Sequence, residues 1–95
     1  MNKEVSKAYF QLSAFEKMLF ETWIQHIEFA RMGNKTTVCL IRADSGFEII
    51  GVSACLDVSK FDAAIGNEYA LKDALRQLDG YVAFHTQETG IPVVE

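Results

Sequence analysis

Four side chains in this sequence are of the types that bind metals or act as nucleophiles: His26, Cys39, Cys55 and His85. A structural zinc site needs ligands at paired spacings such as C-x2-C, and these four residues have no such spacing. A Cys-His nucleophile pair needs both groups within hydrogen-bond reach in a cleft. The two cysteines fall in stretches typical of buried strands, where reduced cysteines pack as small apolar groups. We therefore predict no metal site, no cofactor and no Cys-His catalytic pair.

A second set of residues, Asp57, Asp62, Asp73 and Lys72, could in principle perform acid-base chemistry. Asp57 and Asp62 lie where a helix is predicted to begin, and carboxylates favour the positive end of a helix dipole. Asp73 and Lys72 are neighbours in a predicted helix, an arrangement typical of a solvated helix face. No glycine-rich phosphate loop is present, and Gly51 is better explained as a strand position that lets another backbone or an aromatic ring come close. The sequence thus predicts a protein that is not an enzyme.

The elements that position these residues are organised around a β-hairpin predicted at about 36–55. Two runs of strand-forming residues flank Asp44-Ser45-Gly46, which has the composition of a tight turn. The register that closes this turn places Arg42 opposite Glu48, where the two can form an ion pair across the strands.

The same register distributes the strand side chains over two faces, because successive residues of a strand point to opposite sides. Neither face is polar, so we expect the sheet to be covered on both sides. One cover can be a helix of the same chain, and the second must be another helix or another copy of the protein. One face carries Val38, Leu40, Ile50, Val52 and Ala54, and the other carries Thr37, Cys39, Ile41, Phe47, Ile49 and Gly51.

The N-terminal part of the chain is predicted to form a helix, preceded by residues 1–11, which could be a short helix or an arm. Ser13 followed by Glu16 is a capping-box pattern, and the apolar spacing after it indicates a helix over about 13–25. A start nearer Glu4 is an open alternative. Residues 26–32 alternate between apolar and polar types and favour a first strand over further helical turns, which gives a sheet of two or three antiparallel strands.

The C-terminal part is predicted to form a long helix over about 59–78, with an extension to Phe84 left open. Gly66 within it costs about 1 kcal/mol relative to alanine, which indicates a close approach of another element. Residues 86–95 are expected to be a frayed tail. The fold class predicted for the single domain 1–95 is α+β.

The composition restricts the class of protein further. The chain has 95 residues, of which 49% are hydrophobic, and a net charge of −4. Its nine basic residues are scattered rather than gathered in a stripe, so we do not expect nucleic-acid binding. No signal peptide or membrane-spanning stretch is predicted, and no membrane partner is expected.

Aromatic residues near the start of the chain have two possible roles. Tyr9, Phe10, Phe20 and Trp23 could pack in the core or form a contact surface, because aromatic residues are enriched at interface centres. Association through the second sheet face or the first helix predicts a homodimer. The residues predicted to line an interface are Tyr9, Phe10, Phe20, Trp23, Ile41, Phe47 and Ile49.

The stretch from Thr36 to about Phe84 resembles a family of small tailed-phage proteins, named after the gene 49 product of phage N-four and the gene 66 product of phage Sf-six. The resemblance rests on TTVCLI, GFEIIGVSACLDVSKFDAAIGNEYALKDAL and LDGYV. Members usually carry a tryptophan and a proline shortly before the final Gly-Tyr, where this chain has residues 76–79. The resemblance implies a phage or prophage origin and a shared fold, and it carries over no catalytic residue.

These observations predict a phage accessory protein that acts in the cytoplasm of its bacterial host by binding a protein. Inhibition of a host or anti-phage defence protein is the favoured action. One alternative is a module that binds or sequesters a small ligand, such as a nucleotide, in a pocket between subunits. Another is a virion or assembly component.

Overall fold

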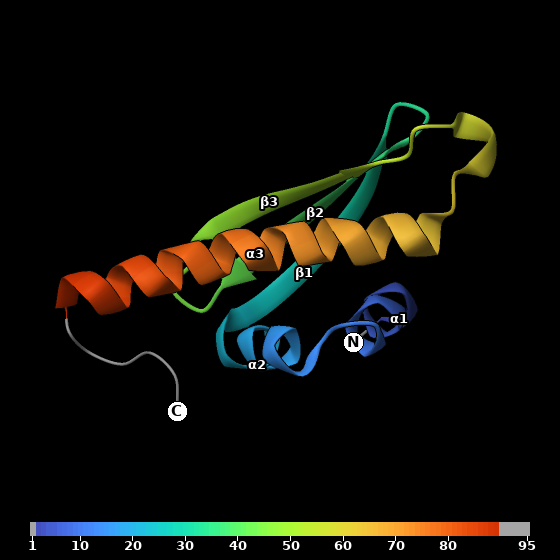
Figure 1. Cartoon of the computed structure of the whole chain (residues 1–95). Coiled ribbons are helices and arrows are strands. Elements are labelled where there is room, and N and C mark those ends of the chain that lie inside the picture. Colours follow the sequence, from blue (N-terminus) through green and yellow to red (C-terminus); the bar gives the residue numbers. More distant parts are fainter. Residues whose placement is uncertain (1, 90–95) are drawn as a thin grey trace.

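Three strands and three α-helices make up residues 2–89, the part of the chain that the computed structural model describes (Figure 1). The α+β class and the helix-sheet-helix order are as predicted. The elements are α1 (Lys3–Phe10), α2 (Ala14–Trp23), β1 (Ile24–Met32), β2 (Thr36–Ala43), β3 (Glu48–Ala54), a 3-10 turn (Val58–Lys60) and α3 (Ala63–Thr89).

The sheet is antiparallel with the strand order β1-β2-β3. The predicted third strand is confirmed. The predicted hairpin register is also confirmed: Arg42 lies opposite Glu48, and its Nε is 3.1 Å from the Glu48 Oε2. The Ala43 N–H donates to the Phe47 carbonyl at 2.9 Å and closes the turn.

Residues 3–10 form the short helix α1, which is one of the two alternatives left open for residues 1–11, and the helix predicted from Ser13 follows it as α2. The capping box is present at the start of α2: the Glu16 N–H donates to Ser13 Oγ at 3.1 Å, and the Ser13 N–H donates to Glu16 Oε1 at 2.8 Å. A capping box satisfies the first N–H groups of a helix, so it also marks where the preceding helix has ended. Leu12, between the two helices, is buried in the core. The chain leaves α2 at Trp23 and enters β1 directly.

The long C-terminal helix begins later and ends later than predicted. Asp57 caps the separate 3-10 turn, whereas Asp62 caps α3 and accepts the N–H of Ala64 at 2.9 Å. The helix runs through Gly80 and Phe84 to Thr89. The first residues of the predicted frayed tail are therefore helical, and residues 90–95 lie outside the described residues.

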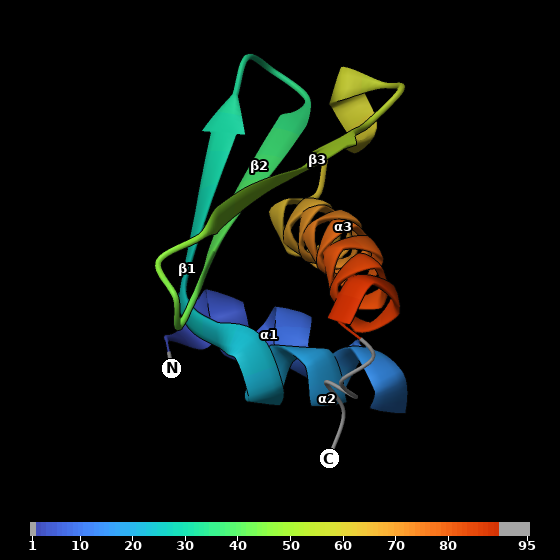
Figure 2. The same cartoon turned by 90° about the vertical axis from the view of Figure 1, so that its left-hand side faces the viewer.

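The helix α3 packs very closely against one face of the sheet (Figure 2). A Cβ atom added at Gly51 would lie 2.2 Å from the Ala70 carbonyl oxygen and 2.5 Å from the Ala74 nitrogen. A Cβ atom added at Gly66 would lie 2.4 Å from Thr37 Oγ1. The close approaches predicted at Gly51 and Gly66 are confirmed, and they require residues without a side chain.

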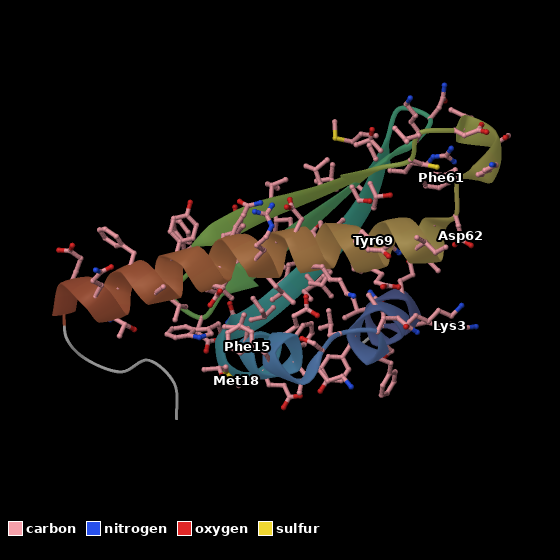
Figure 3. All side chains as sticks on the ribbon, viewed as in Figure 1. Lys3, Phe15, Met18, Phe61, Asp62 and Tyr69 are labelled. Carbon is pink, nitrogen blue, oxygen red and sulfur yellow. The ribbon has the colours of Figure 1, made fainter. Side chains whose placement is uncertain are left out.

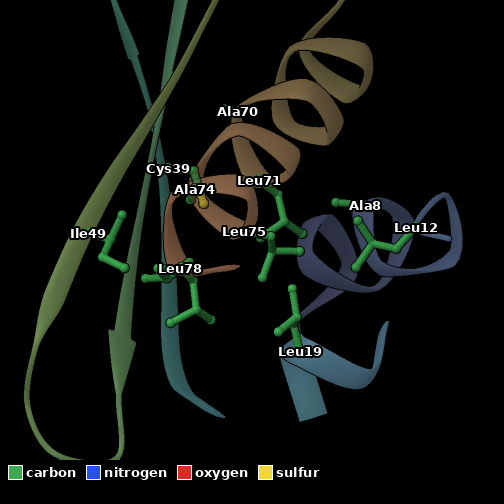
Figure 4. Packing of buried hydrophobic residues seen from close by; sticks show 11 residues of the cluster. Ala8, Leu12, Leu19, Cys39, Ile49, Ala70, Leu71, Ala74, Leu75 and Leu78 are labelled. Atoms are coloured by element: carbon green, nitrogen blue, oxygen red, sulfur yellow. The ribbon is translucent and has the colours of Figure 1, made fainter. Parts of the chain in front are cut away.

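The side of α3 next to this contact carries large side chains of the core. Leu71 and Leu75 point towards α1 and α2, where they meet Leu12 and Leu19 (Figure 4). All three helices lie on the same side of the sheet, with α3 against β2 and β3 and with α1 and α2 beside α3.

Replacing Gly51 by alanine should destabilise the fold by about 3 kcal/mol, because a methyl group cannot fit without moving the α3 backbone. Urea denaturation measures this free energy. Gly80→Ala is the matched control: no atom lies within 4 Å of the added Cβ, so helix propensity should raise stability by about 1 kcal/mol. Equal stability of Gly51→Ala and the natural protein would contradict the packing described.

Candidate functional site

The structure separates the residues that could have formed a nucleophile pair. Cys39 lies in β2 under α3, and burial raises the pKa of its thiol to about 12, so the reactive thiolate is absent at neutral pH. His26 projects from the other face of the sheet, where its Nε2 is 2.8 Å from Glu28 Oε2. Cys55 follows β3 rather than lying within it, and its thiol donates to the Asp57 carbonyl at 3.1 Å. Within residues 2–89, no three His, Cys, Asp or Glu side chains are grouped as metal ligands.

The four residues considered for acid-base chemistry are also apart. Asp57 and Asp62 are helix-start residues, as predicted. Lys72 forms an ion pair with Glu68, with Nζ and Oε2 separated by 3.4 Å. Asp73 was predicted to lie on a solvated helix face, and that prediction is wrong.

Asp73 binds the outer edge of β3. Its Oδ2 accepts the Val52 N–H at 3.0 Å and the Gln77 side-chain amide at 3.2 Å, and Gln77 also donates to the Ile50 carbonyl at 2.8 Å. Burial alone would raise the pKa of Asp73, but hydrogen bonds from Val52, Arg76 and Gln77 outweigh it and lower that pKa below its usual value. Two outward-facing backbone groups of this edge strand are therefore satisfied by α3 and closed to another strand.

Two residues of the predicted interface are in the wrong place for that role. Ile41 and Ile49 are 1% and 5% exposed and belong to the core beneath α3. They cannot contact a partner in this fold, because the helix already covers them.

The N-terminal aromatic residues divide between the two roles left open by the sequence. Tyr9, Phe20 and Trp23 are partly buried and pack against the core, whereas Phe10 is 70% exposed. The Tyr9 hydroxyl donates to Glu21, and this hydrogen bond raises the pKa of Tyr9 above its usual value. Core packing thus accounts for three of these four residues.

Phe47 belongs to a second exposed aromatic group. Its ring meets that of Tyr81 edge-on, with the centroids 5.3 Å apart, and Phe84 follows one turn later on α3. All three side chains are more than half exposed. We call Phe47, Tyr81 and Phe84 the aromatic group. Tyr81 and Phe84 belong to the C-terminal part of α3. This part of the helix extends beyond the sheet (Figure 1).

The sheet face turned away from α3 is not covered by any described element (Figure 2). We call it the open face, and its apolar part spans all three strands. Ile50 and Val52 are 45% and 49% exposed, and Met32 at the end of β1 is 61% exposed. The apolar residues of the open face are Ala30, Met32, Val38, Leu40, Ile50, Val52 and Ala54.

Charged residues cross the same face at one end. His26 of β1 lies opposite Arg42 of β2, which lies opposite Glu48 of β3, and Glu28 is the next residue of β1 on this face. Two ion pairs, His26–Glu28 and Arg42–Glu48, connect the four side chains. We call these four residues the polar row. An apolar patch beside polar residues of both signs has the anatomy of a protein interface.

The family model of the phage protein (N4 Gp49/phage Sf6 gene 66) family matches residues 2–87. The chain belongs to this family of phage proteins. The match includes the N-terminal helices, which the sequence resemblance had not covered. Comparisons of this member of the N4 Gp49/Sf6 gene 66 family with curated proteins and with solved structures found no match. None of the helices described for this family member has the length and apolar character needed to cross a membrane.

Sequence reasoning identified both sheet faces correctly, but it took two of its interface residues, Ile41 and Ile49, from the covered face. The signal that could have decided between the faces was Gly51, which shares a face with Cys39, Ile41 and Ile49. A strand glycine marks a close backbone approach. The face with the glycine is thus the one that the helix covers.

Replacing Asp73 by asparagine should destabilise the fold at pH 7 by about 2 kcal/mol, since hydrogen bonds to a charged carboxylate are lost. Because the folded-state pKa of Asp73 is lowered, its contribution is present above the unfolded pKa of about 3.9 and disappears as the pH falls through the folded value. Urea denaturation should therefore show a smaller difference at pH 3 than at pH 7. Asp79→Asn, on the same helix, is the control. If Asp73→Asn destabilised the fold equally at pH 3 and pH 7, the proposed role of the charged Asp73 carboxylate would be contradicted.

Proposed function

We propose that this phage protein is an accessory protein without catalytic activity that acts by binding another protein in the host cytoplasm. We further propose that it is a homodimer joined through the open face. The single observation that supports this best is the exposed apolar surface of a sheet that has helices on one side only.

The apolar character of the open face supports association. Each Å² of apolar surface removed from water contributes about 25 cal/mol, and contiguous exposed apolar patches on small proteins are commonly contact sites. Three strands spaced about 4.8 Å apart, with about seven residues each, present roughly 300 Å². This is less than the roughly 800 Å² that each partner buries in a standard interface, so we expect a dimer that dissociates in the micromolar range.

The polar row favours a second copy as the occupant of the open face. It contains the bases His26 and Arg42 and the acids Glu28 and Glu48. In an isologous two-fold interface the same patch meets itself, so bases of one copy can face acids of the other. A surface shaped for a strongly charged partner would carry one sign only.

Dimerisation through the open face leaves the aromatic group available on each copy. Phe47, Tyr81 and Phe84 lie at the end of α3, on the helix side of the sheet. Exposed aromatic side chains are the residues most often found at the energetic centre of protein contacts. We propose this group as the contact with a host or anti-phage defence protein, and inhibition of that protein as the action.

Val52→Lys should convert the dimer to a monomer, because it places a charge within the apolar open face. Sedimentation equilibrium over about 1–100 µM measures the dissociation constant, which should rise at least about tenfold. Val58→Lys, at a residue 50% exposed on the 3-10 turn, is the matched control and should leave the dimer intact. A natural protein that is monomeric at the highest concentration, or a dimeric Val52→Lys variant, would rule out this interface.

The proposed action predicts a partner that depends on the aromatic group. Affinity-tagged protein from infected cells should recover a host or defence protein, and the two purified proteins should bind directly. Phe84→Ser should weaken this binding at least about tenfold, while Phe15→Ser, at an α2 residue 51% exposed, should not.

Binding that survives Phe84→Ser, or the absence of any partner that binds when purified, would contradict the proposed contact. Recovery of the protein in purified phage particles would instead support a virion component.

A further inference from the structure

We propose that the N-terminal end of α3 and the adjoining ends of β2 and β3 form a pocket for a small phosphorylated molecule. This inference goes beyond the function proposed above, because the pocket lies within one chain and on the helix side of the sheet. It also differs from the alternative of a ligand site between subunits.

The pocket is a cavity of about 230 Å³. Thr37 and Gly66 contribute to its wall, and two of its other residues, Phe61 and Tyr69, are seen near the start of α3 in Figure 3. A cavity of this volume admits a phosphate group and a small part of whatever carries it, but not a whole drug-sized ligand. The polar and aromatic residues on which the proposal rests are Lys35, Thr37, Ser53, Lys60, Phe61 and Tyr69.

The Thr37 hydroxyl opens onto the pocket. Thr37 is only 3% exposed, and its side chain forms no hydrogen bond with any residue that the structure describes. Trp23 Nε1 is the one fully enclosed side-chain polar atom without a partner among residues 2–89, so the Thr37 hydroxyl keeps its remaining accessible surface towards the pocket that it lines. Gly66 leaves the space that this hydroxyl needs, because a Cβ atom there would lie 2.4 Å from Thr37 Oγ1. An acceptor oxygen from a ligand in the pocket would supply the partner.

The charges around the pocket favour an anion. Lys35 and Lys60 line it, and neither forms an ion pair within residues 2–89. The one acid in the lining is Asp62, whose Oδ1 already accepts the N–H groups of Ala64 and Ile65 at 2.9 and 3.3 Å.

A phosphate group fits this combination better than a carboxylate. It presents three strong acceptor oxygens and more negative charge than a carboxylate, and the lining supplies two lysines and the hydroxyl residues Thr37 and Ser53. The rings of Phe61 and Tyr69 offer an apolar contact for the part of the molecule that carries the phosphate. The Arg31 guanidinium lies 4.0 Å from the Phe61 ring centroid and adds a further positive charge beside the pocket.

An NMR titration of the ¹⁵N-labelled protein at constant ionic strength tests this inference, with inorganic phosphate, ribose 5-phosphate, AMP and adenosine as probes. Sulfate and phosphate stabilise proteins generally, so a thermal shift alone would not be decisive. Saturable shifts of the Ser53 and Gly66 amides are expected with the three phosphates, strongest with AMP, and none with adenosine.

Lys60→Gln should raise the dissociation constant of AMP at least about tenfold, and Thr37→Val, which keeps the side-chain shape, at least about fivefold. Lys3→Gln on α1 is the control and should leave it unchanged. Circular dichroism establishes that each variant is folded.

The proposal is overturned if no probe gives saturable shifts up to about 10 mM, or if Lys60→Gln binds like Lys3→Gln. The monomeric Val52→Lys variant should bind AMP like the natural protein. AMP binding by a monomeric variant would show that the proposed pocket does not depend on the proposed dimer, so each proposal can be tested separately.

Discussion

The contact between Gly51 and the backbone of α3 at Ala70 and Ala74 determines how the rest of the molecule is arranged. It brings the helix closer to the sheet than any residue with a side chain would allow. Because small residues line this contact, it provides little apolar volume, and large core side chains of the helix lie beside it. The N-terminal helices are then needed there to bury Leu71 and Leu75. Three helices on one side leave the second face of the sheet without a cover from the same chain.

The same close approach closes one edge of the sheet. Asp73 and Gln77 reach the Val52 N–H and the Ile50 carbonyl because the helix lies against β3. Edge strands with free backbone groups are prone to pair with other chains, and this edge is partly blocked. Association is thereby directed away from β3's edge and towards the open face, where apolar side chains rather than backbone groups are presented.

The parts of the fold that depend on neighbouring residues could be predicted from the sequence, and the parts that depend on tertiary packing could not. The hairpin register follows from turn chemistry, and the close approaches at Gly51 and Gly66 follow from glycines in unfavourable positions. The alternation of side chains defines two faces but is symmetric between them, so Ile41 and Ile49 were assigned to an interface that they do not reach. The role of Asp73 depends on Val52, which is distant in sequence, whereas the break between α1 and α2 lies just before the Ser13–Glu16 capping box, which the sequence indicates.

A straight helix on a twisted sheet can lie this close over only part of its length, because the strands turn away from its axis on either side. The close contact extends from Gly66 to Ala74, and beyond Ala74 the buried Leu78 and the partly buried Val82 pack against the core. At one end Phe47 of the hairpin turn meets Tyr81, which leaves these rings partly exposed at the end of the helix. At the other end the 3-10 turn brings Phe61 over the start of α3, and the packing is incomplete, so the cavity beside Thr37 remains. The two proposed binding surfaces on the helix side thus arise from one geometric mismatch between helix and sheet, whereas the open face arises from the placement of all helices on one side.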